Sequence, residues 1–209
     1  MPILHNVFTI IGALIKLTFL SAAIVTIPQD AGAPGGLAVI PVNGTTITLQ
    51  INLRNFSNDQ GIDIDGRRCD LATQCDVTFY AYLDAKNASA VWPGSANKSN
   101  LQLVHQSANN NLFTIDKILN YSVCAKSAQI PMLNLRVKVD DSDVLTRDDS
   151  IERFSCLIPE HAFPVADVEE ENAVWSEDLH CVGKVHPLSK VRLTFRYRYF
   201  QAKPTTLCL

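Results

Sequence analysis

Acidic side chains beside a strand-like segment are the residues whose type and spacing best suit a chemical role. The run Asp140-Asp141-Ser142-Asp143 follows an alternating apolar segment, and Asp63 and Asp65 form a second acidic loop. Hard cations such as Ca²⁺ bind where several carboxylate or carbonyl oxygens converge from loops. Asp63, Asp65, Asp140, Asp141 and Asp143 are therefore candidate calcium ligands. The alternative is that they are ordinary turn formers that keep these loops solvated, because the sequence lacks EF-hand spacing.

No catalytic constellation is recognisable in the sequence. None of the five histidines stands near a nucleophile motif, and the G-x-S-x-G, H-E-x-x-H, P-loop and C-x-x-C patterns are absent. His180-Cys181 with His186 lacks the second ligand pair that a structural zinc site requires. The formal net charge of −3 gives no electrostatic basis for binding nucleic acid. We therefore predict a non-enzymatic binding protein with no catalytic residues and no nucleic-acid partner.

Cysteines and glycosylation sequons indicate a secretory route. The six cysteines are an even number, as expected where an oxidising compartment lets them pair. Cys69 and Cys75 are close enough in sequence to close a small loop. The other four allow three connectivities that the sequence leaves open: Cys124, Cys156, Cys181 and Cys208. Five N-x-S/T sequons are candidate glycosylation sites: Asn43, Asn55, Asn87, Asn97 and Asn120.

The N-terminal segment has the character of a signal peptide. Residues 7–27 are almost continuously apolar apart from Lys16, and Ser21-Ala22-Ala23 supplies the small residues that signal peptidase accepts. We interpret residues 1–23 as a signal peptide of a secreted protein. The alternative is an uncleaved anchor that holds the chain on the extracellular side of the plasma membrane, although Lys16 is costly inside a bilayer. We expect a flexible Pro/Gly/Ala-rich leader at 24–43, one domain at 44–200 and a short tail at 201–209.

The hydrophobic period along the chain is two. Apolar and polar side chains alternate over residues 46–53, 77–83, 133–139 and 191–199, and shorter apolar runs at 101–104, 112–115 and 154–158 are weaker strand candidates. Turn-rich segments separate these runs, and no stretch after the leader has a sustained helical period. Strands with one apolar face each must bury those faces against a second sheet. The pattern therefore predicts an all-β antiparallel sandwich of about eight strands.

Three groups of residues carry a family resemblance. The first is Arg54-Asn55-Phe56-Ser57-Asn58 with Gly61, then Asp65-Gly66-Arg67-Arg68-Cys69-Asp70 and Cys75-Asp76-Val77-Thr78-Phe79-Tyr80. The second is the strand from Pro131 to Val139. The third is Val174-Trp175-Ser176-Glu177-Asp178-Leu179-His180 with Gly183 and Leu193-Thr194-Phe195-Arg196-Tyr197-Arg198. In this order, from about residue 44 to 199, they resemble the N-terminal (MNNL, C2-like) domain of Notch ligands of the Delta/Serrate/LAG-2 (Jagged) family.

The chain also departs from that family. Many vertebrate ligands have an extra cysteine where Tyr82 stands and another near Trp92, and neither is present here. The family continues into a cysteine-rich DSL module and EGF repeats, whereas this sequence reads Arg198-Tyr199-Phe200-Gln201 and ends at Leu209. We therefore expect a Notch-ligand-like domain without the DSL and EGF modules, which could bind a receptor without activating it.

The resemblance implies a C2-like β-sandwich that contributes to Notch binding and contacts phospholipid membranes through its apical loops, in some members with Ca²⁺. A C2-like arrangement could bring loops 63–65 and 140–143 to the same edge. Leu71, Val91 and Trp92 lie in expected loops, where they could enter a bilayer or dock on a partner, or else cap the core beneath the sandwich ends.

The expected partners are therefore the EGF repeats of a Notch receptor and a phospholipid membrane surface, with Ca²⁺ as the candidate cofactor. In this interpretation the chain modulates Notch signalling in development. The alternative is a general lipid- or glycan-binding C2-like secreted protein with no Notch role.

Overall fold

Two antiparallel β-sheets make up the described part of this computed structural model, which comprises residues 45–70, 73–125, 129–143, 148–162 and 169–201. The first sheet has the strand order β4 (Leu112–Ala125), β1 (Thr45–Asn58), β11 (Val191–Gln201) and β9 (Leu179–His180). The second has the order β10 (Val182–Gly183), β7 (Asp149–Ile158), β6 (Leu133–Asp141), β2 (Val77–Asp84) and β3 (Gln102–Ser107). A two-stranded ribbon joins β5 (Gln129–Ile130) to β8 (His161–Ala162), and residues Glu170–Asn172 form a 3-10 turn.

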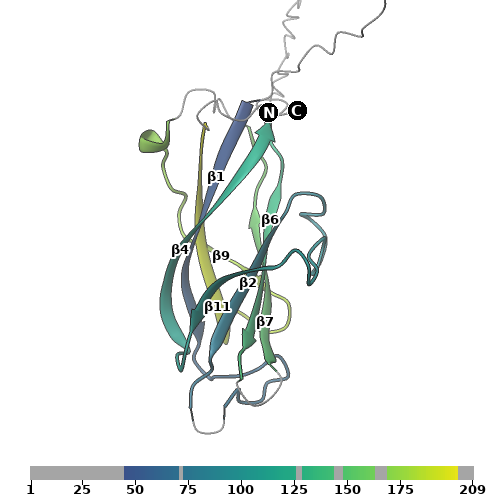
Figure 1. The fold of residues 1–209 in the computed structure, drawn as a ribbon, viewed down its shortest axis with the longest axis vertical. Coiled ribbons are helices and arrows are strands. Elements are labelled where there is room, and N and C mark those ends of the chain that lie inside the picture. Colours follow the sequence, from purple (N-terminus) through teal and green to yellow (C-terminus); the bar gives the residue numbers. More distant parts are fainter. Residues whose placement is uncertain (1–44, 71–72, 126–128, 144–147, 163–168, 202–209) are drawn as a thin grey trace, which may run out of the picture. The chain divides into compact units, whose positions relative to one another are not determined.

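The apolar faces of the two sheets pack against each other, which confirms the predicted antiparallel sandwich (Figure 1). In β1, Leu49, Ile51 and Leu53 are fully buried, as alternation along a half-buried strand requires. Their core includes β2 and β6 residues of the opposite sheet. The rings of Phe56 on β1 and Phe79 on β2 meet edge to face across the interior, with centroids 5.1 Å apart.

Strand β4 is longer than the sequence pattern predicts, because its apolar alternation is interrupted in the middle by the exposed Asp116 and Lys117 and by Ile118, which is 42% exposed. The pairing of β1 with β4 shifts register between Leu53, which lies opposite Lys117, and Asn55, which lies opposite Thr114. Asp116 lies within this irregularity with a φ of 45°, a left-handed conformation that Asp tolerates better than most residues. Phe113 and Ile115 before this irregularity and Leu119 and Tyr121 after it all face the core, but Lys117 takes the apolar position between them. The sequence therefore shows only the short apolar run 112–115 as a strand candidate.

A buried arginine fixes the long connection between β2 and β3. Arg136 on β6 is fully buried, and its guanidinium donates to the backbone carbonyls of Asn87 and Ala90 at 2.9 and 2.7 Å. Its Nε lies 3.4 Å from the buried Asp84 carboxylate, and that carboxylate in turn accepts hydrogen bonds from the backbone of Asn87 and Ser95. The connection is therefore held against the outer face of the second sheet.

The described strands run from Thr45 to Gln201, so the expected signal peptide and leader, and nearly all of the expected tail, lie outside the described residues. Within the described residues, no helix has the length and apolarity needed to cross a membrane.

Candidate functional site

Three connections meet at the end of the sandwich where β1 and β6 finish and β2 begins (Figure 1). Backbone hydrogen bonds join them. The Asn58 amide donates to the carbonyl of Asn111 at 2.7 Å, the Asn110 amide donates to the carbonyl of Cys75 at 3.1 Å, and the Ser142 amide donates to the carbonyl of Asp76 at 2.8 Å. The β1–β2, β3–β4 and β6–β7 connections therefore form one linked surface.

A group of carboxylates lies on this surface. Carboxylate oxygens of Asp70, Asp141 and Asp143 all lie within 4.8 Å of one another. Asp141 is the last residue of β6 and is fully buried, whereas Asp70 and Asp143 are half-buried. Strand β6 therefore fixes one carboxylate beneath two that come from the adjoining connections. We call Asp70, Asp141 and Asp143 the acidic cluster.

The Asp141 carboxylate is incompletely satisfied by the protein. Its Oδ1 accepts a hydrogen bond from the backbone N–H of Asp76 at 2.5 Å, but its buried Oδ2 has no hydrogen-bond partner among the described residues. Burial raises the pKa of Asp141 to about 6, and the neighbouring charges of Asp70, Asp143 and Asp76 act in the same direction. A buried, charged carboxylate with one open oxygen among like charges is unfavourable unless a proton or a cation neutralises it.

A disulfide positions the β1–β2 side of the acidic cluster. Cys69 and Cys75 are bonded, as their spacing in the sequence suggests, and their sulfurs lie within 4.8 Å of the Asp141 carboxylate. Asp70 directly follows Cys69 and Asp76 directly follows Cys75. The side chain of Asp76 accepts the backbone N–H of Asn109 at 2.7 Å, so the bridge and this turn contact fix both ends of the segment that carries Asp70.

The donor set fits a hard divalent cation. Three carboxylates converge, one of them has an unpaired buried oxygen, and oxygen ligands are those that Ca²⁺ prefers. The sulfurs near Asp141 belong to a disulfide and are not available as thiolate ligands, so this site does not suit a soft metal.

Two of the five candidate calcium ligands, Asp141 and Asp143, lie in the acidic cluster. Asp63 and Asp65 instead organise the turn that precedes it. The buried Asp63 Oδ1 accepts hydrogen bonds from the backbone N–H groups of Asp65 and Arg67, and the Arg67 side chain bonds both carboxylates at 2.9 Å. This pairing raises the pKa of Arg67.

Asp140 also has protein partners of its own. Lys138 forms an ion pair with its carboxylate, and the Ser150 hydroxyl donates to it at 3.1 Å. Because successive strand residues point to opposite faces, Asp140 and Asp141 project to different sides of β6. Asp70 is not one of the five predicted ligands, but it lies in the acidic cluster. Its signal was its position beside Cys69, where disulfide closure fixes the backbone.

Two of the three predicted contact residues, Val91 and Trp92, do not border the acidic cluster. Val91 is 87% exposed and Trp92 is half-buried, and both belong to the connection that follows β2, whereas Asp141 pairs with Val77 at the start of β2. Leu71 lies outside the described residues. Val91 is thus available to solvent, but at the other end of β2.

The sequons and remaining cysteines are placed as follows. Asn55, Asn87, Asn97 and Asn120 are all exposed, as glycan attachment would require, and Asn43 lies outside the described residues.

Cys156 on β7 is bonded to Cys181, which selects one of the pairings left open by the sequence. Cys208 and the side chain of Cys124 are not among the described parts of the chain.

Comparisons with known proteins identify the fold. A scan against models of protein families and a search of curated proteins each found no match. Among solved structures, a C2 domain protein from Ramazzottius varieornatus matches with a TM-score of 0.66 and 25% identity over 80% of this chain and 95% of that one. The described residues therefore form a C2-like β-sandwich, and C2 domains are generally non-catalytic binding modules.

Two further similar structures match less closely. Drosophila C2-DSL-EGF1 has a TM-score of 0.38 and 17% identity over 74% of this chain and 67% of that one. The calcium-bound pair of C2 domains of Extended-Synaptotagmin 2 has a TM-score of 0.42 and 15% identity over 78% of this chain and 48% of that one.

Proposed function

We propose that this chain is an extracellular, non-enzymatic binding domain whose acidic cluster takes up Ca²⁺ and, with the ion in place, engages anionic phospholipid headgroups. The observation that carries the proposal is the Asp141 carboxylate, buried at the end of β6 with Oδ2 unpartnered and two further carboxylates within reach. Asp70, Asp141 and Asp143 would hold the ion.

Calcium would supply the positive charge that this end of the sandwich lacks. Without it, three converging carboxylates repel a phosphate or phosphatidylserine headgroup. With it, the surface loses that repulsion, and open coordination positions of the ion can accept lipid oxygens. The role of Asp141 is to fix the ion against the rigid strand end, and that of the Cys69–Cys75 bridge is to hold Asp70 in place.

Vesicle co-sedimentation tests this function. We expect the purified secreted chain to sediment with phosphatidylserine-containing vesicles in Ca²⁺ and to remain in the supernatant in EDTA or with phosphatidylcholine alone. Asp141→Asn and Asp143→Asn should abolish the calcium-dependent fraction. Asp65→Asn is the matched control, because it removes an exposed carboxylate that pairs with Arg67 outside the acidic cluster. Equal binding by Asp141→Asn and the unmodified chain would refute the proposal.

A Notch receptor is the second candidate partner. The ordered set of motifs from Arg54 to Arg198 supports it, because these motifs resemble those of the Notch-ligand N-terminal domain in the same order along the chain. Immobilised Notch EGF repeats should then retain the chain, and soluble chain should compete with a membrane-anchored ligand in a signalling assay. Retention equal to that on unrelated EGF repeats would leave only the lipid-binding alternative.

A further inference from the structure

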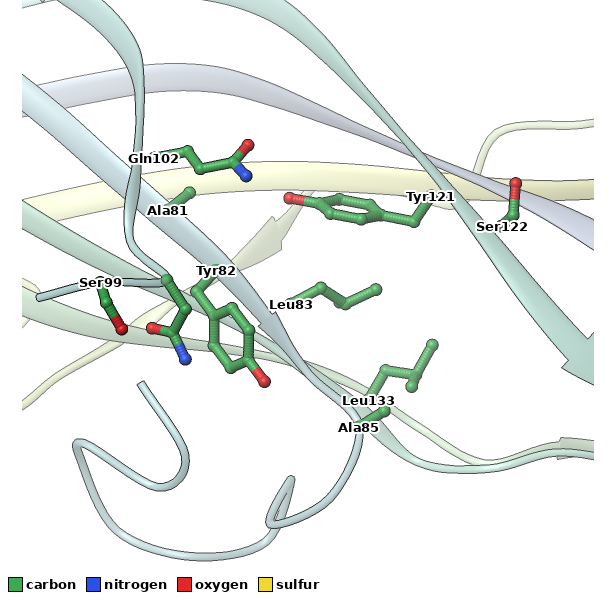
Figure 2. A pocket seen from close by; sticks show the side chains of 10 residues that line it. Ala81, Tyr82, Leu83, Ala85, Ser99, Gln102, Tyr121, Ser122 and Leu133 are labelled. Atoms are coloured by element: carbon green, nitrogen blue, oxygen red, sulfur yellow. The ribbon is translucent and has the colours of Figure 1, made fainter. Parts of the chain in front are cut away.

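A cavity of about 690 Å³ opens at the edge of the sandwich between the two sheets. Its walls come from the end of β2, the connection into β3, β4 and the start of β6 (Figure 2). The lining residues are Ala81, Tyr82, Leu83, Ala85, Ser99, Asn100, Gln102, Tyr121, Ser122 and Leu133.

The cavity exists because β3 begins only opposite Ala81, so it does not cover the last residues of β2. The last pair between them joins Ala81 to Gln102, so the final residues of β2 have no strand neighbour on that side. The chain that leads into β3 is held by its own contacts. Arg136 anchors the carbonyls of Asn87 and Ala90, and the Asn100 side chain donates to the carbonyl of Ser95 at 2.9 Å. The gap between the sheets is therefore kept open.

Polarity changes from the floor of this cavity to its mouth. Leu133 is fully buried and Ala81 is 3% exposed, so the deepest positions are apolar. Ser99, Gln102 and Ser122 are exposed at the mouth and supply hydroxyl and amide groups. Burial raises the pKa of the Tyr121 phenol to about 12, so its hydroxyl stays protonated and neutral at physiological pH.

The chemistry of the lining selects a class of ligand. None of the ten lining residues is charged, so a carboxylate or phosphate group would enter without a countercharge, which is costly. A saccharide would place hydroxyl groups against the Ala81 and Leu133 floor, where they would lose their hydrogen bonds. A ligand with an apolar body and an uncharged polar head suits both the apolar floor and the polar mouth of the cavity. The volume of the cavity lies in the range of small-molecule sites, roughly 300–1,000 Å³.

We propose that this cavity binds an uncharged single-chain amphipathic lipid, such as a monoacylglycerol. The acyl chain lies against Leu83 and Leu133, and the hydroxyl head meets Gln102 and Ser122 at the mouth. This site is separate from the acidic cluster, because Leu83 pairs with Leu135 whereas Asp141 pairs with Val77 at the other end of β2. Binding here is therefore independent of Ca²⁺.

A fluorescent monoacylglycerol tests the site by equilibrium titration of the full secreted chain in EDTA. We expect saturable binding that unlabelled monoacylglycerol displaces. Ala85→Trp and Gln102→Trp, two exposed positions at the rim, should each weaken binding at least tenfold by filling the entrance. Ala108→Trp is the control, because Ala108 is exposed just past the opposite end of β3.

Several outcomes would overturn the proposal. The first two are a monoacylglycerol titration that does not saturate and rim variants that bind the lipid as well as the control does. The third is tighter binding of the matching fatty acid, or of a methyl glycoside, than of the monoacylglycerol. The fourth is loss of monoacylglycerol binding when calcium is chelated. Because the titration is done in EDTA, its result does not depend on whether the acidic cluster binds Ca²⁺. Normal binding here with no calcium-dependent vesicle binding would reject the proposed function alone.

Discussion

Replacing Asp141 by Asn should make the metal-free protein more stable at neutral pH. In the folded chain the Asp141 pKa is about 6, against an ordinary value of 3.8. The charged form therefore costs about 3 kcal/mol of folding free energy above pH 6. The amide of Asn keeps an acceptor for the Asp76 N–H but buries an NH₂ group where Oδ2 has no partner, which costs about 1–2 kcal/mol. The net gain is about 1–2 kcal/mol.

This gain should depend on pH with a defined sign. The folded-state pKa of Asp141 is raised, so the unmodified chain becomes more stable as pH falls through 6 and carries the full cost only above 6. Asp141→Asn lacks that slope. In EDTA at pH 7.5, urea unfolding should therefore show that the variant is more stable than the unmodified chain. A thermal scan under the same conditions should give a Tm higher by about 2–8 °C. Near pH 4 the order of stability should reverse.

The matched control for this measurement is Asp65→Asn, whose carboxylate is exposed and paired with Arg67. We expect its stability to change by less than about 0.5 kcal/mol. A variant Asp141→Asn that is less stable than the unmodified chain at pH 7.5, or whose advantage is the same at both pH values, would refute the account of this carboxylate.

Three further predictions follow from the same contacts. Replacing both Cys69 and Cys75 by Ser should lower the free energy of unfolding in urea by about 2 kcal/mol and weaken Ca²⁺ affinity. Replacing Cys156 and Cys181, which close a longer loop, should lower it by about 3–4 kcal/mol and leave Ca²⁺ affinity unchanged. Equal effects of the two replacements on Ca²⁺ affinity would contradict the role given to the Cys69–Cys75 bridge. Arg136→Met should lower the free energy of unfolding by about 3–5 kcal/mol, because it leaves the Asp84 charge buried without its partner. Adding Asp84→Asn to that variant should recover part of the loss, measured by urea unfolding. Purely additive effects of the two substitutions would contradict the pairing. Ca²⁺ affinity should fall as pH drops through about 6, where Asp141 takes up a proton; a calcium titration that gives the same affinity at pH 5 and 7.5 would exclude Asp141 as a ligand.

The fold was predictable where each strand has one buried face. Ile47, Leu49 and Ile51 alternate with polar residues in the sequence and are all buried in the structure, because burial of one face imposes a period of two. The full length of β4 was not predictable from that period, because Lys117 stands where an apolar residue would continue the series and the apolar Ile118 is exposed. The short strands β9 and β10 contain two residues each, too few to give any periodic signal.

The acidic cluster was predictable only in part, for a related reason. Sequence places Asp140, Asp141 and Asp143 at a strand end but does not say which side chains face the same side, and strand geometry directs Asp140 to Lys138 and Ser150. Asp63 and Asp65 each form an ion pair with Arg67, and spacing in the sequence alone does not reveal these pairs. The proximity of Asp70 depends on the fold of the bridged loop beside β6.

Calorimetric titration of Ca²⁺ into the purified chain at pH 7.5 tests the central claim most directly. We predict saturable binding to the unmodified chain and to Asp65→Asn, and no binding to Asp70→Asn or Asp141→Asn, with the correct fold of each variant verified by its cooperative unfolding. Binding that survives in Asp141→Asn, or that is lost in Asp65→Asn and retained in Asp70→Asn, would contradict the assignment of the acidic cluster as the calcium site.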